Sequence, residues 1–545
     1  MPLVGDSRRR FVLSIFRSQR GLFLVTKVKT TFGLFCGAIA LTGCGAEEIV
    51  SPGTGGNVII NNPPATPPPP PPPPPSTVTA AAGCPTISDP AGLTDEGTIT
   101  GPTGDYRICR LPARFSASAN LPYIEGLLYR MAGRVDVGTD GGPAPDASDG
   151  LSDTNVELSI EPGAIIYASG SSFLMVNRGN TINAVGTAAR PIVFTSRDNV
   201  LGLNGEDSSG QWGGVVLGGR APVTDCIAPG ATPGTVNCER QVEGAAQPAI
   251  FGGATPGDSS GTLSFVQIRY SGFVLSGDNE LQSLTTGGTG SGTVFNNVMS
   301  FNSSDDGVEF FGGFVDMKGL VVVGAEDDSI DTDTGVKANL QYVVAVQRNE
   351  VGDAIIEADS NNGLQDQTPR QNTRISNATF IQRKTDDQVV RIRGGTDYAL
   401  LNTLIVDNSQ GTACLRIDLP ETLRAANAGL DDVGPPIFNS LNLDCATDFR
   451  DGSSGTTAAQ VQTVFDAGSN NNAAYVNSLT MTYINGANED ALTAFDPTAL
   501  SMFFDNAGFV GAAQAGDTRF EGWTCDSAAI TFGNNVGACT SLPVY

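Results

Sequence analysis

From about residue 156 onward, the chain is dominated by short runs in which apolar and polar residues alternate. Alternation of this kind is typical of a β-strand with one buried face. The clearest runs are residues 156–167, 173–176, 192–195, 215–217 and 263–270. Gly, Asn, Asp and Ser separate them, which indicates tight turns between strands rather than helical connections.

Between residues 294 and 418 the pattern repeats itself. Segments starting at Val294, Met317, Leu340, Ile375 and Leu401 each open with a β run, and most continue with an acidic turn and a second β run. The repeat length is about 20 to 35 residues, which is typical of solenoids. We therefore predict an all-β parallel β-helix, with coils stacked about 4.8 Å apart and Gly or Asn at the tight corners. A β-sandwich or β-propeller is the alternative.

The regions on either side of this repetitive body have a different pattern, and we divide the whole chain into five predicted segments. The strand pattern is weak over residues 84–150, and short helices are expected at 456–466 and 496–504. Open solenoid ends invite aggregation unless they are covered. We expect a signal peptide over 1–43, a lipidated cysteine and proline-rich linker over 44–83, an N-terminal cap region over 84–150, the β-helix over 151–450 and a C-terminal cap region over 451–545.

The first 43 residues combine a basic start with an apolar stretch, residues 30–40. This stretch is too short to span a bilayer and is typical of a secretory signal. It ends in Leu41-Thr42-Gly43-Cys44, which resembles the lipobox of bacterial lipoproteins. The resemblance implies cleavage before Cys44, acyl chains such as palmitate on it, and a lasting membrane anchor. Gly45 favours the outer membrane; an ordinary signal peptide with a chance cysteine is the alternative.

An unbroken run of prolines, residues 67–75, follows the predicted anchor. Polyproline is a stiff spacer, and this run would span about 30 Å. Beyond it the chain has an even number of cysteines, which predict disulfide staples formed in an oxidising compartment. Pairing in sequence order is the simplest arrangement, because each bridge then closes a local loop. The candidates are Cys84, Cys109, Cys226, Cys238, Cys414, Cys445, Cys525 and Cys539.

The charge balance excludes several classes of function. Lys and Arg total 31 against 57 Asp and Glu, for a net charge of −26, and there is no histidine. So acidic a chain is not expected to bind nucleic acid, which needs clustered Lys and Arg. Without histidine, neither a Ser-His-Asp nor a Cys-His mechanism is available, nor is a His-ligated metal site.

Acidic turns recur within the repeat. If they stack in register, Asp306, Asp328, Asp353 and Asp387 form a column. Two carboxylates 4.8 Å apart repel by about 3.5 kcal/mol at an effective dielectric constant of 20. Calcium would relieve this repulsion, since it takes oxygen ligands in flexible geometry. The predicted ligands are Asp305, Asp306, Asp327, Asp328, Asp331 and Asp333. Alternatively, each Asp caps its own turn through backbone N–H groups.

Two arginines form a second candidate site. Arg391 and Arg393 are two residues apart, so both face one side of a strand. They could bind an acidic sugar or offset the charges of Asp386 and Asp387. The pair Asp305-Asp306 and the segment Arg391-Ile392-Arg393 also resemble parts of the polygalacturonase site. That family additionally uses a Gly-His-Gly motif, which a chain without histidine cannot supply.

Several motifs together resemble secreted and surface lipoproteins of Gram-negative bacteria. They are Glu161-Pro-Gly, Arg190-Pro-Ile-Val-Phe-Thr-Ser, Gln211-Trp-Gly-Gly, Asp305-Asp-Gly-Val-Glu-Phe-Phe-Gly-Gly and Asp327-Asp-Ser-Ile-Asp-Thr-Asp-Thr-Gly. The resemblance implies a right-handed β-helix, a place at the cell surface or outside the cell, and the type II secretion machinery as a partner. It brings no catalytic residue with it.

The sequence therefore predicts a lipid-anchored cell-surface or secreted β-helix protein. Its role would be binding, scaffolding or accessory work at the envelope, nutrient acquisition being one such role. Expected partners are the membrane, through the anchor, and a glycan or envelope protein. The absence of an active-site motif favours a non-catalytic protein. The alternative is a calcium-assisted polysaccharide-binding or polysaccharide-degrading enzyme that uses Asp carboxylates.

Overall fold

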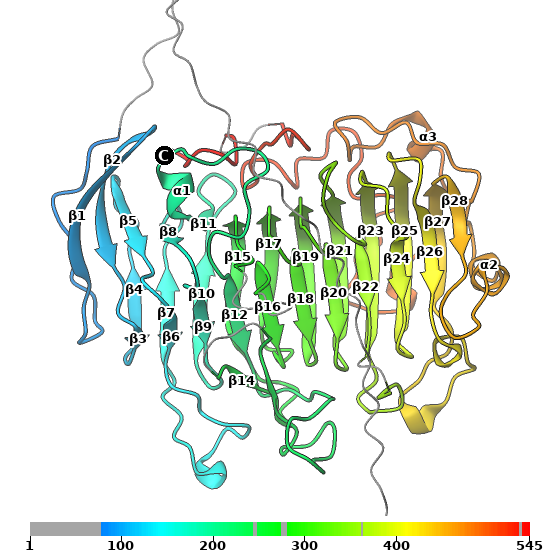
Figure 1. Ribbon diagram of the computed structural model, residues 1–545, viewed down its shortest axis with the longest axis horizontal. Helices are drawn as coiled ribbons and strands as arrows, with labels where there is room; N and C mark the ends of the chain where they lie inside the picture. Colours follow the sequence, from blue (N-terminus) through cyan, green and yellow to red (C-terminus); the bar gives the residue numbers. More distant parts are fainter. Residues whose placement is uncertain (1–77, 244–247, 274–280, 361–362, 534–536) are drawn as a thin grey trace, which may run out of the picture. The chain divides into compact units, whose positions relative to one another are not determined.

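The computed structural model describes residues 78–243, 248–273, 281–360, 363–533 and 537–545. These residues belong to one unit and build two long sheets from successive coils of the chain (Figure 1). The expected signal peptide, Cys44 and the proline run lie outside the described residues.

The larger sheet contains 15 strands within the described residues. Its main path is β1 (Thr94–Gly101), β2 (Gly104–Arg110), β5 (Leu127–Arg130), β8 (Ile165–Ala168), β11 (Ile192–Ser196), β15 (Gly261–Arg269), β17 (Val294–Phe301), β19 (Phe314–Val323), β21 (Lys337–Val346), β23 (Asn372–Gln382), β25 (Asp397–Asp407) and β27 (Ile437–Asp444). A branch of β4 (Ala119–Leu121), β7 (Glu157–Ile160) and β10 (Thr181–Val185) joins at β15. The pairs are parallel except β1 with β2.

The smaller sheet is parallel throughout. Its order is β3 (Arg114–Phe115), β6 (Val135–Val137), β9 (Leu174–Val176), β12 (Val215–Gly218), β16 (Leu284–Gly287), β18 (Val308–Phe311), β20 (Ile330–Asp333), β22 (Ile356–Ala358), β24 (Gln388–Ile392), β26 (Ala413–Ile417) and β28 (Thr447–Arg450). A separate antiparallel hairpin pairs β13 (Arg240–Gln241) with β14 (Ile250–Phe251). The helices are α1 (Arg197–Val200), α2 (Ala458–Asp466) and α3 (Ala487–Asp490), with 3-10 turns at Ala147–Asp149, Pro420–Thr422, Ala428–Leu430 and Pro497–Ala499.

Each long strand of the larger sheet bends at one residue. The first half of β15 pairs with β10 and its second half with β11, and Phe265 between them has a φ of 51°. The same left-handed corner recurs in the later coils, at Asn297, Gly319, Tyr342, Asn377, Asn402 and Ser440. Gly and Asn adopt this conformation with little strain. A coil therefore contributes three short strands, as in a parallel β-helix.

Apolar residues from both sheets meet in one continuous core. Val308 and Phe310 of β18 and Leu320 and Val322 of β19 are fully buried in the same cluster. The predicted all-β parallel fold with a continuous core is confirmed, in place of a sandwich or propeller. The right-handed sense of the coil and the two caps stay predictions.

Four disulfides staple the described chain, and their pairing follows sequence order as expected. The bonds are Cys84–Cys109, Cys226–Cys238, Cys414–Cys445 and Cys525–Cys539. Closing a local loop restricts the unfolded chain, so each bond is expected to stabilise the fold by about 3 kcal/mol.

The helix predicted over 456–466 is confirmed as α2, which starts with a capping box between Thr457 and Gln460. The helix predicted over 496–504 is wrong, because only one 3-10 turn, Pro497–Ala499, forms there. The chain leaves the helical path so that Phe504 can pack against Ala399 and Leu401 of β25.

The last described part of the chain, residues 467–533 and 537–545, runs back along the larger sheet toward its first coils (Figure 1, orange to red). We call it the C-terminal strap. Its backbone accepts hydrogen bonds from successive coils: Ser440 Oγ donates to Thr493 O, Asn402 Nδ2 to Phe495 O, Asn377 Nδ2 to Phe509 O, Gln267 Nε2 to Trp523 O. The hydroxyl of Tyr545 ends the path at Pro191 O. The strap therefore covers the left-handed corner row and the second halves of these strands.

Candidate functional site

The candidate site lies on the outer face of the smaller sheet. In β18, Val308 and Phe310 point into the core, so Glu309 and Phe311 point outward. In-register pairing stacks such outward residues coil upon coil. We call the resulting row the outer column; it runs Met175, Val216, Thr285, Glu309, Asp331, Glu357, Arg391 and Arg416. The row changes from apolar to acidic to basic along the stack.

Acidic turns lead into three of these strands. The Oδ1 of Asp306 accepts a hydrogen bond from the backbone N of Asp328 at 2.9 Å. The Oδ1 of Asp328 in turn accepts one from the N of Ala354 at 2.7 Å. Each buried Asp therefore caps the turn of the following coil, not its own turn as the alternative interpretation proposed. This use of one oxygen leaves the second oxygen of each carboxylate for other ligands.

A cavity of about 450 Å³ opens between these turns and the outer column. Its described lining is Glu243, Gln282, Ser304, Asp305, Asp306, Glu309, Glu326, Asp327 and Asp331. Seven of these residues are acidic, and none of the described lining residues is Lys or Arg. We call this cavity the acidic cleft. Of the seven acidic residues, Glu326 is paired with Arg348, which is not a lining residue; the described lining itself supplies no basic side chain.

Two acidic side chains in the cleft lack the partners that buried carboxylates need. Glu309 is only 6% exposed, and the described residues offer its carboxylate no hydrogen bond or ion pair. Asp331, its neighbour in the ladder, has a buried Oδ1 without a hydrogen-bond partner among the described residues. Buried carboxylates of this kind call for a proton or a cation.

The pKa values follow from this environment. Burial raises the pKa of Glu309 well above its usual range, and the carboxylates of Asp331 and Asp305 raise it further. Burial likewise raises the pKa of Asp306, with Asp305 and Glu309 as the next causes. The pKa of Asp331 is raised by burial and then by Glu357. In water these groups would be ionised at neutral pH, but here they compete to hold protons.

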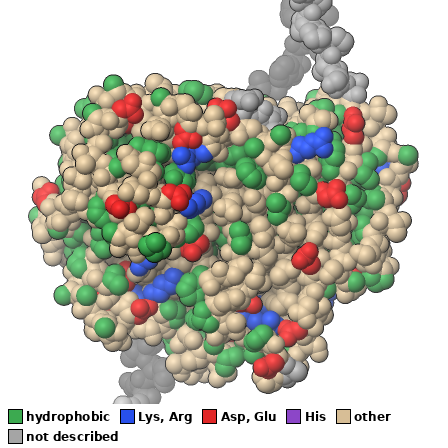
Figure 2. Space-filling view, turned by 180° about the vertical axis from the view of Figure 1, so that it is seen from behind, with side chains coloured by type: hydrophobic (Ala, Val, Ile, Leu, Met, Phe, Trp, Pro, Cys, Tyr) green, Lys and Arg blue, Asp and Glu red, His purple; other side chains and the backbone are tan. Residues whose placement is uncertain are grey.

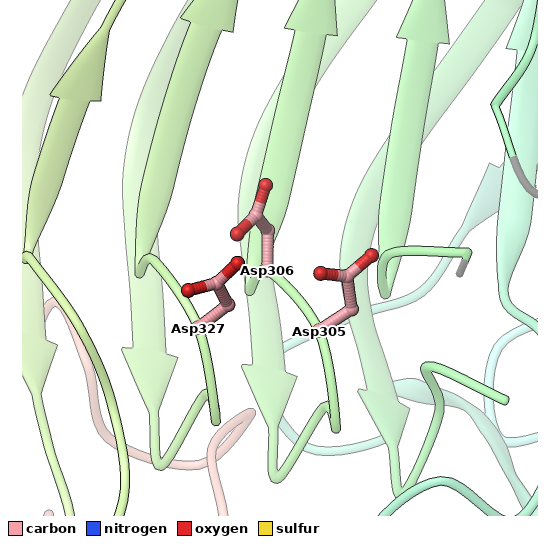
Figure 3. Close-up of side chains that lie close together, drawn as sticks. All are labelled: Asp305, Asp306 and Asp327. Atoms are coloured by element: carbon pink, nitrogen blue, oxygen red, sulfur yellow. The ribbon is translucent and has the colours of Figure 1, made fainter. Parts of the chain in front are cut away.

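Three overlapping sets of carboxylates have the spacing of a metal site. In each set, one oxygen per residue lies within 4.8 Å of the others: Asp305 with Asp306 and Asp327, Asp306 with Glu309 and Asp331, and Asp327 with Asp328 and Asp353. Figure 3 shows Asp305 and Asp306 on one turn and Asp327 on the turn of the next coil, with the carboxylates drawn together. Two of the sets share Asp306 and two share Asp327.

The predicted calcium ligands are thus brought together except for one. Asp305, Asp306, Asp327, Asp328 and Asp331 each belong to one of the three sets. Asp333 belongs to none of the sets; its Oδ1 accepts a hydrogen bond from the N of Thr334. Burial raises the pKa of Asp333 to about 7, and the nearby carboxylate of Asp359 adds to the shift.

Arg391 and Arg393 both lie on the outer face, but their charges are already paired. Arg391 contacts Glu357 and Asp418, each at 3.0 Å. Arg393 contacts Glu357 at 3.1 Å and Asp359 at 2.8 Å. Their acidic partners are therefore not the expected Asp386 and Asp387.

In the outer column, the acidic residues Glu309, Asp331 and Glu357 are followed along the stack by the basic residues Arg391 and Arg416. Asp386 pairs with Lys384 at 2.7 Å, and Asp387 with Arg450 at 2.8 Å. A similar balance holds on the face seen in Figure 2, where Lys and Arg side chains lie among Asp and Glu side chains. Within the described residues, the acidic cleft differs from this pattern because its lining contains seven acidic residues and no Lys or Arg.

Glu309, Glu326 and Glu243 line the cleft but were not predicted from the sequence. Glu309 had a local signal, since it is the acidic residue of the apolar strand Val308–Phe311. Glu243 had none, because it reaches the cleft from a loop more than 60 residues away in the chain from Asp306.

Among the described residues, no helix is both long enough and apolar enough to cross a membrane. Cys44, the predicted lipidation site, lies outside the described residues.

A parallel β-helix with an acidic cleft on its outer face defines the class of this protein. Residues 150–483 match the model of the pectate-lyase-like β-helix domain. The chain belongs to this family, and membership is consistent with a polysaccharide-related β-helix protein. No curated protein and no solved structure matches the chain.

Proposed function

We propose that this protein binds an anionic polysaccharide through calcium held in the acidic cleft. The observation that carries the proposal is Glu309, which is buried in a cleft of seven acidic residues with no described partner for its charge. A bound cation would offset the repulsion between the carboxylates and supply the contact that Glu309 lacks.

The donor set favours calcium over other metals. All candidate ligands are carboxylate oxygens, and the chain has no histidine. Each Ca–O bond is about 2.3–2.6 Å, so two oxygens on one ion are at most about 5 Å apart. The three sets lie within 4.8 Å, which fits this limit. Three carboxylates leave part of the usual coordination shell of calcium for water or an incoming ligand.

The charge of the cleft indicates how a polysaccharide would bind. An anionic sugar polymer and a face lined by Asp305, Glu309 and Asp331 repel each other. Calcium joins the two because it accepts carboxylate oxygens from both. Arg391 and Arg393 do not take this role, since their charges are used by Glu357, Asp359 and Asp418.

A second candidate function is polysaccharide cleavage. It is favoured by the raised pKa of Asp306, which makes this residue a proton donor close to Asp305 and Asp327. A protonated and an ionised carboxyl group on the two sides of a glycosidic bond can act as general acid and base. New chain ends released from a polymer, and lost in Asp306→Asn, would support cleavage; an unchanged polymer would support binding alone.

The location is part of the proposal. We infer that the chain is exported and anchored through lipid on Cys44, at the outer membrane or cell surface. The lipobox-like Leu41-Thr42-Gly43-Cys44 and four disulfides, which form in oxidising compartments, support this. Mass spectrometry of the N-terminal peptide from membrane-extracted protein tests it: acylated Cys44 is expected, and a free thiol there would contradict the anchor.

Calorimetric titration of the full chain with Ca²⁺ tests the cleft. We expect binding that EDTA reverses and that Glu309→Gln weakens at least tenfold, or about 1.4 kcal/mol. Glu309→Gln removes a buried charge, so the variant should fold at least as well as the wild type without calcium. Asp466→Asn, at the exposed end of α2, is the matched control and should bind as the wild type does. A wild-type chain that gives no calcium binding would overturn the proposed function.

A further inference from the structure

The acidic cleft is bounded on one side by an insertion between β12 and β15. Residues 221–243 and 248–253 of this insertion contain the hairpin β13–β14. Its apolar side chains form one buried cluster with outward residues of the smaller sheet. The cluster consists of Phe173, Met175, Val216, Val223, Cys238, Val242, Ala249, Phe251, Leu281 and Phe311. We call this insertion the end wall.

Along the outer column, the end wall covers the apolar residues that come before the acidic part. The rest of the insertion runs beside the cleft, where Thr224 N donates to Thr334 O and Asp225 N to Gln367 Oε1. The end wall covers Met175 of β9 and Val216 of β12. The next outward residues are Thr285 and Glu309, and Glu309 lines the cleft. Glu243 of the end wall itself lines the cleft. The outer column at Met175 and Val216 is therefore closed to a ligand, and the wall forms one end of the cleft.

Several contacts fix the end wall in place. The Cys226–Cys238 disulfide closes its base. Arg178, whose side chain is 1% exposed, pairs with Glu239 at 2.6 Å and donates to Gly252 O at 3.0 Å. The ring of Phe251 packs beside Phe311 at 5.9 Å between centroids.

Gly287 shows how closely the wall approaches the sheet. A Cβ at this position would lie 2.4 Å from the ring of Phe251, so only glycine fits. Side-chain packing of this density resists displacement. The wall is therefore a fixed boundary and not a flap.

The opposite end of the cleft is open. Beyond Asp331 the outer column continues with Glu357, Arg391 and Arg416, whose side chains keep 15–23% exposure. The acidic groups follow the stacking direction from Asp306 and Glu309 to Glu357. A polymer with regularly spaced charges would run along this row, and in the other direction it would meet the end wall.

We infer that the cleft binds the end of a polysaccharide chain and not its middle. The inference rests on the proposed function, since it assumes an anionic polymer held by calcium. The last sugar of the chain lies against the end wall, next to Glu243 and Gln282, and the remaining sugars leave over Glu357 and Arg391. A cavity of about 450 Å³ suits such a short terminal segment.

The test uses the full chain in saturating Ca²⁺ and uronic-acid homopolymers in short, intermediate and long preparations. Calorimetry gives the number of protein molecules bound per polymer chain. End recognition predicts one protein per chain at every length, with a dissociation constant per mole of chains that stays within about threefold. Internal recognition predicts that the number bound rises with length, and this result would overturn the inference.

Two further arms separate this result from failure of the proposed function. Calcium alone is titrated first, and absence of calcium binding would refute the proposed function and the inference with it. Chemical reduction of the polymer's reducing end follows. A large loss of affinity assigns the reducing end to the wall, and unchanged one-to-one binding assigns the other end. Calcium binding without any binding of the uronate polymers would overturn end recognition of an anionic chain.

Discussion

At the residue scale, each buried carboxyl group on the outer face is stabilised either by a proton or by a bound cation. Glu309 and Asp331 are stacked neighbours; burial is the main cause that raises the pKa of each, followed by Asp331 for Glu309 and by Glu357 for Asp331. Burial of this kind stabilises the protonated form, and a bound cation stabilises the ionised form. In the proposed calcium site, protons and the divalent ion would therefore compete, according to pH and calcium concentration.

Asp333 gives a pH dependence that can be measured. Burial raises its pKa to about 7, whereas an unfolded Asp titrates near 3.9. Between these values the folded chain holds more protons than the unfolded chain, so stability falls as pH rises from about 4 to 7. In EDTA we expect the wild-type melting temperature to decrease over this window. Over this pH window, the free energy of unfolding should fall by about 2–4 kcal/mol less in Asp333→Asn than in the wild type.

The Asn side chain keeps an oxygen for the N–H of Thr334, so this variant isolates the titration from the turn. Scanning calorimetry at several pH values measures the effect, and Asp466→Asn is the control that should leave the profile unchanged. An Asp333→Asn profile that follows the wild-type profile from pH 4 to 7 would contradict the raised pKa of Asp333.

At the scale of elements, the strands and acidic turns were predictable because the same sequence pattern recurs in successive coils. The alternation of strands such as Val308–Phe311 and the Asp pairs before them repeat from coil to coil, so they predicted the stack and the clustering of the acidic turns. In the predicted column Asp306 does meet Asp328, but Asp328 is followed by Ala354 and not by Asp353. The left-handed corners were predictable where Asn or Gly occupies them. They were not predictable at Phe265 and Tyr342, which are poor residues for that conformation.

The strap explains these two corners. Phe265 packs edge-on against Trp523 at 6.2 Å, and Tyr342 lies under the guanidinium of Arg519 at 3.6 Å. Tertiary packing with residues more than 170 positions away in the chain overrides the local preference. Glu243 is likewise brought to the cleft from a separate loop, more than 60 positions before Asp306. Contacts of this kind leave no local pattern, so they require the structure.

At the scale of the whole described unit, two segments decide which faces are free. The C-terminal strap covers the corner row of the larger sheet, and the end wall covers the first coils of the smaller sheet. The acidic cleft lies between the end wall and the paired arginines, on the sheet that the strap leaves uncovered. The strap is expected to stabilise the larger sheet, and the proposed calcium site lies on the smaller sheet. Mutations should therefore change one property without the other.

Trp523 tests this separation. Its side chain is fully buried, its Nε1 donates to Arg519 O at 2.8 Å, and its ring contacts Phe265 and Phe520. Trp523→Ala would leave a cavity under the strap and is expected to lower the free energy of unfolding by about 3–5 kcal/mol. Thermal melting measures the loss, and Met502→Ala, at a side chain that is 88% exposed, should melt as the wild type does.

Calcium affinity below the melting transition should stay unchanged in both variants, because the cleft lies on the other sheet. A Trp523→Ala chain that melts like the wild type would show that the strap is not part of the cooperative unit, and weaker calcium binding would show that the two faces are coupled.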